Sequence, residues 1–451
     1  MKRSPGPCLI GLDLGTSATK GVVTDSRGRI LAEAETGVRL LTPRTGWVEL
    51  DPEDRYRGVC HVIRELSAAA APDSVAALAM AAASGNTLLT DATGAPLASI
   101  VNWMDRRAEQ QPLAALADLD VAEVARIAGW PCVRSFPLAH LAWMREHRPD
   151  LYERAAHVGM DTDWLLFRLT GAWKMDHSTA TTFHLQSQTA RAFHEPFLRR
   201  LALPRHKLSD LVPSGSAVGP LTPGAARDTG LTTRAVAVAG SFDHPAAARA
   251  AGVLRPGQLL LSCGTSWVGF MPRASRNDLL EASLLCDPFL SDRGGPWGGM
   301  FSVPHIGRAI DWYADCVAGA GEKDRFRVFD ELAAAAPPGA EGVTIDLREP
   351  PRTVAADRRN ISRAVMEGAA RLLADRLREL APHGFRFERA VLVGGAARSS
   401  VWPGIIAAEA GLRLDVGTRH AGALGAAMLA GIGAGLYRDE GDARQAWGCD
   451  A

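Results

Sequence analysis

The chain has 451 residues, about three times the length of a common ~150-residue domain, so a single small fold is excluded. Hydrophobic residues make up 47% of the chain and charged residues 22%, a balance that excludes disorder on a large scale. Lys plus Arg and Asp plus Glu both number 50, and the formal net charge of +0 argues against nucleic acid or an acidic membrane surface as a partner.

The seven cysteines are scattered and contain no C-x-x-C pair. This favours reduced thiols, and therefore a cytoplasmic protein, over a disulfide framework or a zinc site. The first apolar run is broken by Gly11 and Asp13, so we expect no signal peptide. Residues 421–436 are uncharged, but 16 residues rich in Ala and Gly are too short to span a bilayer and predict a buried helix.

Two segments share a pattern of strand, Gly-Thr-Ser turn and strand. In the first, Leu9–Leu12 leads through Gly15-Thr16-Ser17 to Gly21–Thr24, and a turn at 25–28 introduces a further strand. In the second, 258–262 runs into Gly264-Thr265-Ser266 and then 267–271. The recurrence predicts two domains of one architecture.

Apolar periodicity predicts helices over Asp54–Ala70, Ala108–Ala128, Leu138–His147, Thr162–Leu169 and Ile361–Leu380. Further apolar runs predict strands over Arg29–Ala34, Ala235–Ala239 and Ala390–Val393, the last of which ends in Gly394-Gly395-Ala396. A stretch rich in Pro and Gly covers 204–230. We therefore expect an N-terminal domain over residues 1–245 and a C-terminal domain over 246–451.

A Gly-Thr-Ser turn places backbone N–H groups and hydroxyls where they can surround phosphate oxygens. One such turn also serves in a plain hairpin, whereas two, each after an apolar strand, suit the β- and γ-phosphates of a nucleotide. The turns thus predict Thr16, Ser17, Gly264 and Thr265 as phosphate contacts. Lys20 either neutralises phosphate charge or is solvated.

Two aspartates stand beside these turns. Asp13 precedes the first turn, where a carboxylate next to phosphate is expected to hold Mg²⁺; the alternative is a turn-capping aspartate. Asp243 follows a predicted strand and precedes a helix with Pro245 in its first turn, so it is either an N-cap or a general base for a substrate hydroxyl. His244 either orients this carboxylate or is a packed or solvated histidine.

Several ordered motifs carry a resemblance over nearly the whole chain: GLDLGTSATKGVVTD at 11–25, GWVELDPED at 46–54, NWMDRRA at 102–108, GSFDHPAAARAAGVLRPGQLLLSCGTS at 240–266 and VLVGGAARSS at 391–400. Together they resemble the FGGY family of carbohydrate kinases. The resemblance implies an α/β fold of two actin-like (ribonuclease-H-like) ATPase domains with an inter-domain cleft. It also implies ATP-dependent phosphorylation of a sugar or polyol hydroxyl, with ATP and Mg²⁺ as cofactors.

The resemblance also assigns roles. Asp243 matches the catalytic base and Asp13 the aspartate near Mg²⁺. Gly394, Gly395, Ala396 and Ser399 match the segment that contacts the adenosine part of the nucleotide. Contacts to the sugar are implied for Asp243, for Ser84 and Gly85 in the loop that reads Met-His-Gly in xylulose kinases, and for Trp103, Asp105 and Arg106 in the Trp-x-Asp-x-Arg region.

The chain departs from the family pattern at four places. His244 replaces the usual Asn or Gln after the base, and Ala83-Ser84 replaces the Met-His pair. Residues 336–360 are rewritten, and His420 stands where an acidic residue is common. None of these changes removes a residue that the chemistry requires, but they leave the sugar open among ketoses such as xylulose, ribulose, fuculose and rhamnulose.

Two other function classes compete with a sugar kinase: a non-catalytic sugar or nucleotide sensor, and an actin-like ATPase that acts without a sugar. Retention of Asp13, both Gly-Thr-Ser turns and Asp243 favours the enzyme. The expected partner is a small sugar or polyol, with no nucleic acid and no membrane, and a homodimer is compatible with the sequence.

Overall fold

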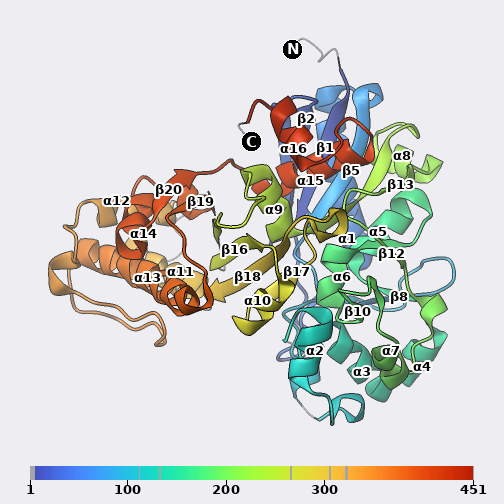
Figure 1. The fold of residues 1–451 in the computed structure, drawn as a ribbon, viewed down its shortest axis with the longest axis horizontal. Coiled ribbons are helices and arrows are strands. Elements are labelled where there is room, and N and C mark those ends of the chain that lie inside the picture. Colours follow the sequence, from blue (N-terminus) through green and yellow to red (C-terminus); the bar gives the residue numbers. More distant parts are fainter. Residues whose placement is uncertain are drawn as a thin grey trace. The chain divides into compact units, whose positions relative to one another are not determined.

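The computed structural model describes residues 6–110, 112–131, 134–264, 267–303, 306–319 and 324–449 (Figure 1). The chain divides into two compact units. Unit 1 comprises Met1–Gly252, Leu285–Gly295 and His420–Ala451, and unit 2 comprises Val253–Leu284 and Pro296–Arg419. Each unit is built on its own β-sheet.

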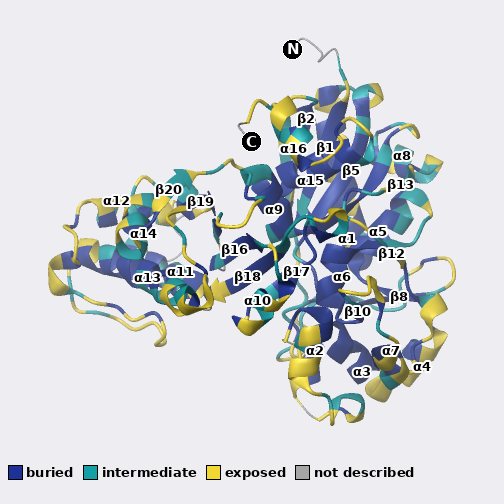
Figure 2. Cartoon of the chain, viewed as in Figure 1, coloured by how far each residue is buried: buried dark blue, intermediate teal, exposed yellow. Residues whose placement is uncertain are grey.

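The main sheet of unit 1 has the strand order β13-β14-β5-β1-β2-β3. These strands span Ala217–Pro220 (β13), Val236–Phe242 (β14), Val75–Ala82 (β5), Cys8–Leu14 (β1), Ala18–Asp25 (β2) and Ile30–Gly37 (β3). Strands β14, β5 and β1 are parallel, and β2 and β3 continue the sheet antiparallel. The parallel strands carry near-continuous apolar runs because both faces of the sheet are covered, and Figure 2 shows β1 and β5 as buried.

Helix α15 (Ala421–Gly433) packs against β1, β5 and α9 (Asp243–Ala251), beside the sheet in Figure 1. Its small residues allow this close approach. A Cβ atom on Gly11 would lie 1.8 Å from the carbonyl oxygen of Ala423, and one on Gly425 would lie 1.9 Å from that of Ala246. The helix is therefore a buried layer of unit 1, which confirms the predicted packed helix.

The other face and the remainder of unit 1 are mostly helical. The helices are α1 (Pro52–Ala70), α2 (Val121–Ala128), α3 (Pro137–His147), α4 (Pro149–Arg154), α5 (Asp161–Thr170), α6 (His177–Phe183), α7 (Glu195–Leu201), α8 (Pro223–Thr229) and α16 (Glu440–Ala446). The short strands are β4 (Glu49–Leu50), β6 (Leu88–Thr90), β7 (Ile100–Val101), β8 (His157–Gly159), β9 (Lys174–Asp176), β10 (Gln186–Ser187), β11 (Ala192–Phe193), β12 (Asp210–Val212) and β17 (Leu285–Asp287).

Within unit 2 the strands follow the order β18-β16-β15-β19-β20. They span Trp297–Val303 (β18), Trp267–Arg273 (β16), Leu260–Cys263 (β15), Arg389–Gly394 (β19) and Arg413–Val416 (β20). The helices of this unit are α10 (Arg276–Glu281), α11 (Ile306–Ala318), α12 (Arg325–Ala334), α13 (Arg358–Leu380) and α14 (Trp402–Ala410). Strand β15 is antiparallel to β16 and parallel to β19, and β19 is parallel to β20.

The two sheets therefore repeat one topology, because β18-β16-β15-β19-β20 has the order and directions of β3-β2-β1-β5-β14. The prediction of two domains of one architecture is confirmed.

One predicted helix is wrong. Of the described residues within 108–128, only Val121–Ala128 is α-helical, preceded by short 3-10 turns at Arg107–Glu109 and Ala114–Leu116. Pro112 interrupts the predicted helix, because proline lacks the backbone donor that a helical hydrogen bond requires. Asp120 then starts the true helix, with its side chain accepting a hydrogen bond from the Ala122 backbone N–H.

The compact units divide the chain elsewhere than the expected boundary between residues 245 and 246. That boundary would cut α9, and residues His420–Ala451 return to unit 1. The physical reason is the packing of α15 on β1, which a division by sequence position cannot anticipate. Within the described ranges, we find no helix with the length and apolarity that a membrane span requires.

Candidate active site

Three predicted site segments lie at the carboxyl ends of the three parallel strands of unit 1. Asp13 is the penultimate residue of β1, Ser84 and Gly85 come shortly after β5, and Asp243 directly follows β14. Asp13 and Ser241 are both paired in register with Ala81 of the central strand. Because the carboxyl ends of parallel strands share one edge, these residues lie at the same edge of the sheet, with β1 and β14 about 10 Å apart.

Asp13 is a partly buried carboxylate next to the first turn of α15. A Cβ atom on Gly422 would lie 2.7 Å from its Oδ2, so glycine is needed where the helix begins. Burial, and next the negative charge of Asp243, raise the pKa of the Asp13 carboxyl to about 7 against the opposing charges of Lys20 and Arg55. The two aspartates are thus electrostatically coupled across the edge of the sheet.

Asp243 is the first residue of α9, and Phe242 occupies the N-cap position, so the N-cap interpretation of Asp243 is wrong. Its Oδ1 accepts a hydrogen bond of 2.7 Å from the His244 backbone N–H and lies 3.7 Å from His244 Nε2. About a quarter of the Asp243 side chain is exposed, at 24%. Its burial raises the pKa of this carboxyl, and the charge of His244 opposes the rise.

The first Gly-Thr-Ser turn joins β1 to β2. Ser17 is exposed, and Thr16 Oγ1 accepts a hydrogen bond of 3.2 Å from Trp103 Nε1. Lys20 is exposed on β2 as the register partner of Asp13, so the two side chains share a face of the sheet. The turn therefore joins the predicted phosphate contacts to Trp103, which belongs to the predicted sugar contacts.

The other predicted sugar residues separate into two groups. Ser84 is buried, with its Oγ 2.7 Å from Thr182 Oγ1, and Gly85 lies against the ring of Phe136. Asp105 is 0% exposed, with both carboxylate oxygens accepting hydrogen bonds from protein donors. It accepts from Val48 N at 2.6 Å and forms an ion pair with Arg107 at 2.9 Å. This carboxylate is enclosed by protein donors.

The arginine at the end of Trp-x-Asp-x-Arg is Arg107, one residue beyond the predicted Arg106. Arg107 is buried, pairs with Asp105 and with Glu49 Oε1 at 2.6 Å, and stacks over the ring of Trp47 at 3.8 Å. Arg106 is exposed. The motif therefore forms a structural clamp around the loop that carries Trp103.

Unit 2 brings its predicted nucleotide residues to the ends of β15 and β19, where Cys263 and Gly394 are register partners. Gly264 and Gly395 are exposed at these strand ends, and Ala396 is buried just after them. Ser399 Oγ accepts hydrogen bonds of 3.1 Å from the backbone N–H groups of Val401 and Trp402, at the start of α14. Thr265 lies outside the described residues.

Residues 8–249 match the FGGY family of carbohydrate kinases, N-terminal domain, and residues 327–434 match the C-terminal domain of the same family. The chain belongs to the FGGY family of carbohydrate kinases. It is 28% identical to an autoinducer-2 kinase of Salmonella choleraesuis over 96% of this chain and 87% of that protein. It is also 28% identical to a xylulose kinase of Escherichia coli, over 94% and 90% of the two chains.

Among solved structures, xylulose kinase from Rhodospirillum rubrum superposes with a TM-score of 0.81 at 25% identity, covering 95% of this chain and 91% of that one. This FGGY kinase therefore has the actin-like ATPase fold, and it is an ATP-dependent sugar kinase.

Three residues of this FGGY kinase that the sequence analysis did not single out lie beneath the predicted site: Arg55, Asn86 and Asp161. All three are buried and joined by hydrogen bonds. A signal existed for Arg55, because it falls on the apolar stripe of α1 with Val59 and Val62, where an arginine needs a buried partner. Nothing in the local sequence marked Asn86 or Asp161.

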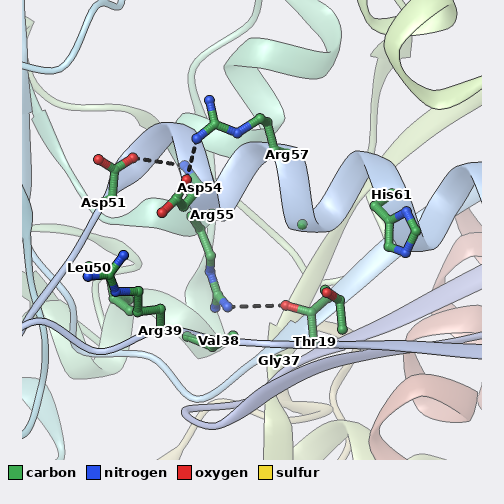
Figure 3. Close-up of a pocket in the computed structure, with 12 residues that line it drawn as sticks. Thr19, Gly37, Val38, Arg39, Leu50, Asp51, Asp54, Arg55, Arg57 and His61 are labelled. Atoms are coloured by element: carbon green, nitrogen blue, oxygen red, sulfur yellow. Dashed lines mark hydrogen bonds and ion pairs between the residues drawn. The ribbon is translucent and has the colours of Figure 1, made fainter.

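A cavity of about 310 Å³ lies between α1 and the ends of β2 and β3 (Figure 3). Arg55 and Thr19 line it, together with Arg39, Asp51 and His61. None of the predicted site residues lines this cavity. Among the described residues there is no cluster of three or more His, Cys, Asp or Glu side chains that could hold a metal ion.

Proposed function

We propose that this FGGY kinase transfers the γ-phosphate of ATP to a hydroxyl of a ketose such as xylulose, ribulose, fuculose or rhamnulose. Asp243 serves as the general base and Asp13 as the carboxylate that faces the metal. One observation carries the proposal: two partly buried, electrostatically coupled carboxylates lie at the carboxyl ends of β1 and β14, the two parallel strands that flank β5, beside a Gly-Thr-Ser turn.

A carboxylate that acts as the general base must lie near the reacting hydroxyl and be unprotonated in the working pH range. The backbone of α9 fixes the position of Asp243, and the backbone N–H of His244 donates a hydrogen bond to its Oδ1. Burial raises its pKa, which makes it a better proton acceptor than a solvated aspartate. When the sugar oxygen attacks phosphorus, Asp243 takes the proton from that hydroxyl while the bond from the γ-phosphorus to the bridging oxygen breaks.

The donor set at this edge fits Mg²⁺, an ion that prefers carboxylate oxygens and retains most of its water ligands. Asp13 supplies such an oxygen, and its pKa of about 7 indicates a carboxylate short of compensating positive charge. When bound, Mg²⁺ neutralises charge on the phosphates. Asp13 would hold the ion, and Thr16 and Ser17 would offer hydroxyls to the same phosphates.

Two features support Gly264 as a nucleotide contact. It is exposed, and a Cβ atom built on it would meet none of the described parts of the chain within 4 Å. The protein itself therefore does not require glycine there, whereas a phosphate that approaches the backbone closely would require it.

The acceptor proposal draws on relatives of two named activities. The xylulose kinases support a ketose, and the autoinducer-2 kinases add the ligand of those enzymes as a further candidate. Ser84 is smaller than the histidine of the Met-His-Gly loop, so its pocket has lost an imidazole and offers a hydroxyl that is bonded to Thr182.

The test is ADP release from Mg-ATP across a panel of ketoses, polyols and autoinducer-2, with Asp243→Asn beside the parent protein. We expect strong stimulation by one compound and a fall in kcat of about 10²- to 10⁴-fold in the variant. A thermal shift with ATP checks that the variant still binds nucleotide.

Stabilisation by ATP without stimulation by any compound would replace the kinase proposal with the sensor. Turnover without a sugar, accompanied by polymerisation seen in light scattering, would replace it with the actin-like ATPase.

A further inference from the structure

Beneath the predicted sugar loop of unit 1, buried side chains form a continuous series of hydrogen bonds. Arg55 Nε donates to Asp161 Oδ2 at 3.1 Å, and Asn86 Nδ2 donates to Asp161 Oδ1 at 3.0 Å. Asn86 Oδ1 in turn accepts from the backbone N–H of Trp103 at 3.1 Å. The indole Nε1 of Trp103 donates to Thr16 Oγ1 at 3.2 Å.

We propose that Arg55, Asp161 and Asn86 act as a positioning chain that fixes Trp103, and through its indole Thr16, for binding of the sugar. The proposal rests on the proposed function and on the contact between Trp103 and the sugar that the family resemblance implies. None of the three residues touches substrate itself.

The charge of Asp161 decides how the amide of Asn86 is oriented. An ionised carboxylate only accepts hydrogen bonds, so Asn86 must present its NH₂ group to Asp161. Its carbonyl oxygen then faces the opposite way, where it accepts from Trp103 N and from Asn102 Nδ2 at 3.2 Å. An amide turned the other way would place two donors against each other at Trp103.

Arg55 and Asp161 form a buried ion pair. The side chains of the pair are 3% and 1% exposed, so each charge depends on the other for compensation. Arg55 Nη1 also donates to Thr19 Oγ1 at 3.3 Å, as Figure 3 shows beneath α1. Its Nη2 reaches the Leu14 carbonyl at 3.4 Å, just before the phosphate turn. The arginine thus anchors the chain to both β1 and β2.

Removing Arg55 or Asp161 alone would leave a buried charge unpaired and is expected to unfold the unit, so Asn86 is the residue to change. Asn86→Asp has nearly the same shape as the parent side chain, but it replaces the NH₂ donor with a carboxyl group that can lose its proton. When protonated, it donates to Asp161 and accepts from Trp103 as asparagine does. When ionised, it faces Asp161 with a like charge and cannot donate.

Other charged groups near this position are Arg55, which pairs with Asp161, and Asp13, whose pKa the charge of Arg55 lowers. The Asp105–Arg107 pair lies close enough to act on His140. His140 on α3 contacts the neighbouring Thr87, and burial lowers the pKa of its imidazole to about 3, so it stays neutral. Dividing each variant's KM for the sugar by that of the parent at the same pH removes the titration of Asp13 and Asp243.

The matched control is Asn360→Asp in unit 2, where Asn360 Nδ2 donates to Glu341 Oε2 at 2.7 Å. This is the same chemical change, opposite a carboxylate, in the unit that lacks the predicted sugar loop. A second variant, Asn86→Leu, removes both hydrogen bonds at every pH, and Asn86→Ser serves if Asn86→Leu is not folded.

The measurements are KM for the most active sugar between pH 5.5 and 8.5, and hydrogen–deuterium exchange at the Trp103 amide. For Asn86→Asp we expect a KM ratio near the parent value at low pH and at least about tenfold higher at high pH. Asn86→Leu should be impaired throughout, with faster exchange at Trp103, and Asn360→Asp should show no pH-dependent ratio.

A KM ratio for Asn86→Asp that does not change with pH, or unchanged exchange at Trp103 in Asn86→Leu, would overturn the positioning chain. If no sugar stimulates the parent protein, the proposed ketose substrate fails. The exchange at Trp103 then decides the positioning chain by itself.

Discussion

The two units repeat one strand order, yet they end their equivalent strands with different chemistry. In unit 1 the residue before the end of β1 is Asp13, and Asp243 follows β14. In unit 2 the equivalent positions hold Ser262 and Gly417. Carboxylates suit a metal ion and a proton, whereas small uncharged residues let a polyanion approach the backbone. Under the proposed function, the duplicated fold would carry acid–base chemistry in one unit and backbone recognition in the other.

The largest effect should come from removing a charge in unit 1. Asp13→Asn deletes the carboxylate that we propose faces the metal, and we expect kcat to fall about 10²- to 10³-fold in the ADP-release assay. Ser262→Ala, the equivalent change in unit 2, should stay within a few-fold of the parent rate. Equal losses in both variants would show that the two strand ends do not differ in this way.

The next effect concerns the backbone of unit 2. Gly394 has a φ of +91°, and a Cβ atom there would lie 2.6 Å from the Cys263 carbonyl oxygen. Gly394→Ala should therefore lower the free energy of unfolding by about 1–3 kcal/mol, measured in denaturant. Gly395→Ala is the control, because its Cβ would be at an ordinary 3.6 Å from the same oxygen. Similar losses in both would contradict a strained turn at Gly394.

A pH effect on stability is expected from Asp13 of unit 1. The folded protein keeps the proton on Asp13 up to about pH 7, whereas the unfolded chain loses it near 3.8. Between these values the folded state binds more protons, so this group makes the free energy of unfolding fall as pH rises. Asp13→Asn should flatten the fall between pH 5 and 8 in thermal melts without added Mg²⁺. An unchanged slope would contradict the raised pKa.

The smallest effect is expected at Gly264, which follows β15 in unit 2. Gly264→Ala fills open space, so we expect it to raise stability by about 0.4–1 kcal/mol while raising KM for ATP several-fold. Gly37→Ala in unit 1 also fills open space and should raise stability with no change in KM for ATP. If Gly264→Ala leaves KM for ATP unchanged, no phosphate approaches that glycine.

Local sequence was sufficient where the signal lay within one segment. The strand, turn, strand pattern around Gly15 and Gly264 predicted the repeated halves, because apolar alternation and turn residues act over a few neighbours. It was insufficient for residues 108–128, where apolar spacing outweighed Pro112 in our prediction. The family resemblance placed Asp105 among the sugar contacts, whereas the structure encloses its side chain with donors from Val48 and Arg107.

The sequence by itself determined the family, the two-sheet architecture and Asp13 and Asp243 as candidates, since each depends on residues that adjoin a strand end. Only the tertiary structure decided that α15 belongs with β1 and that Arg55, Asp161 and Asn86 meet beneath Trp103. These contacts join residues separated by up to several hundred positions. Whether a buried polar side chain is paired depends on which segments pack against it, and that is set by the whole fold.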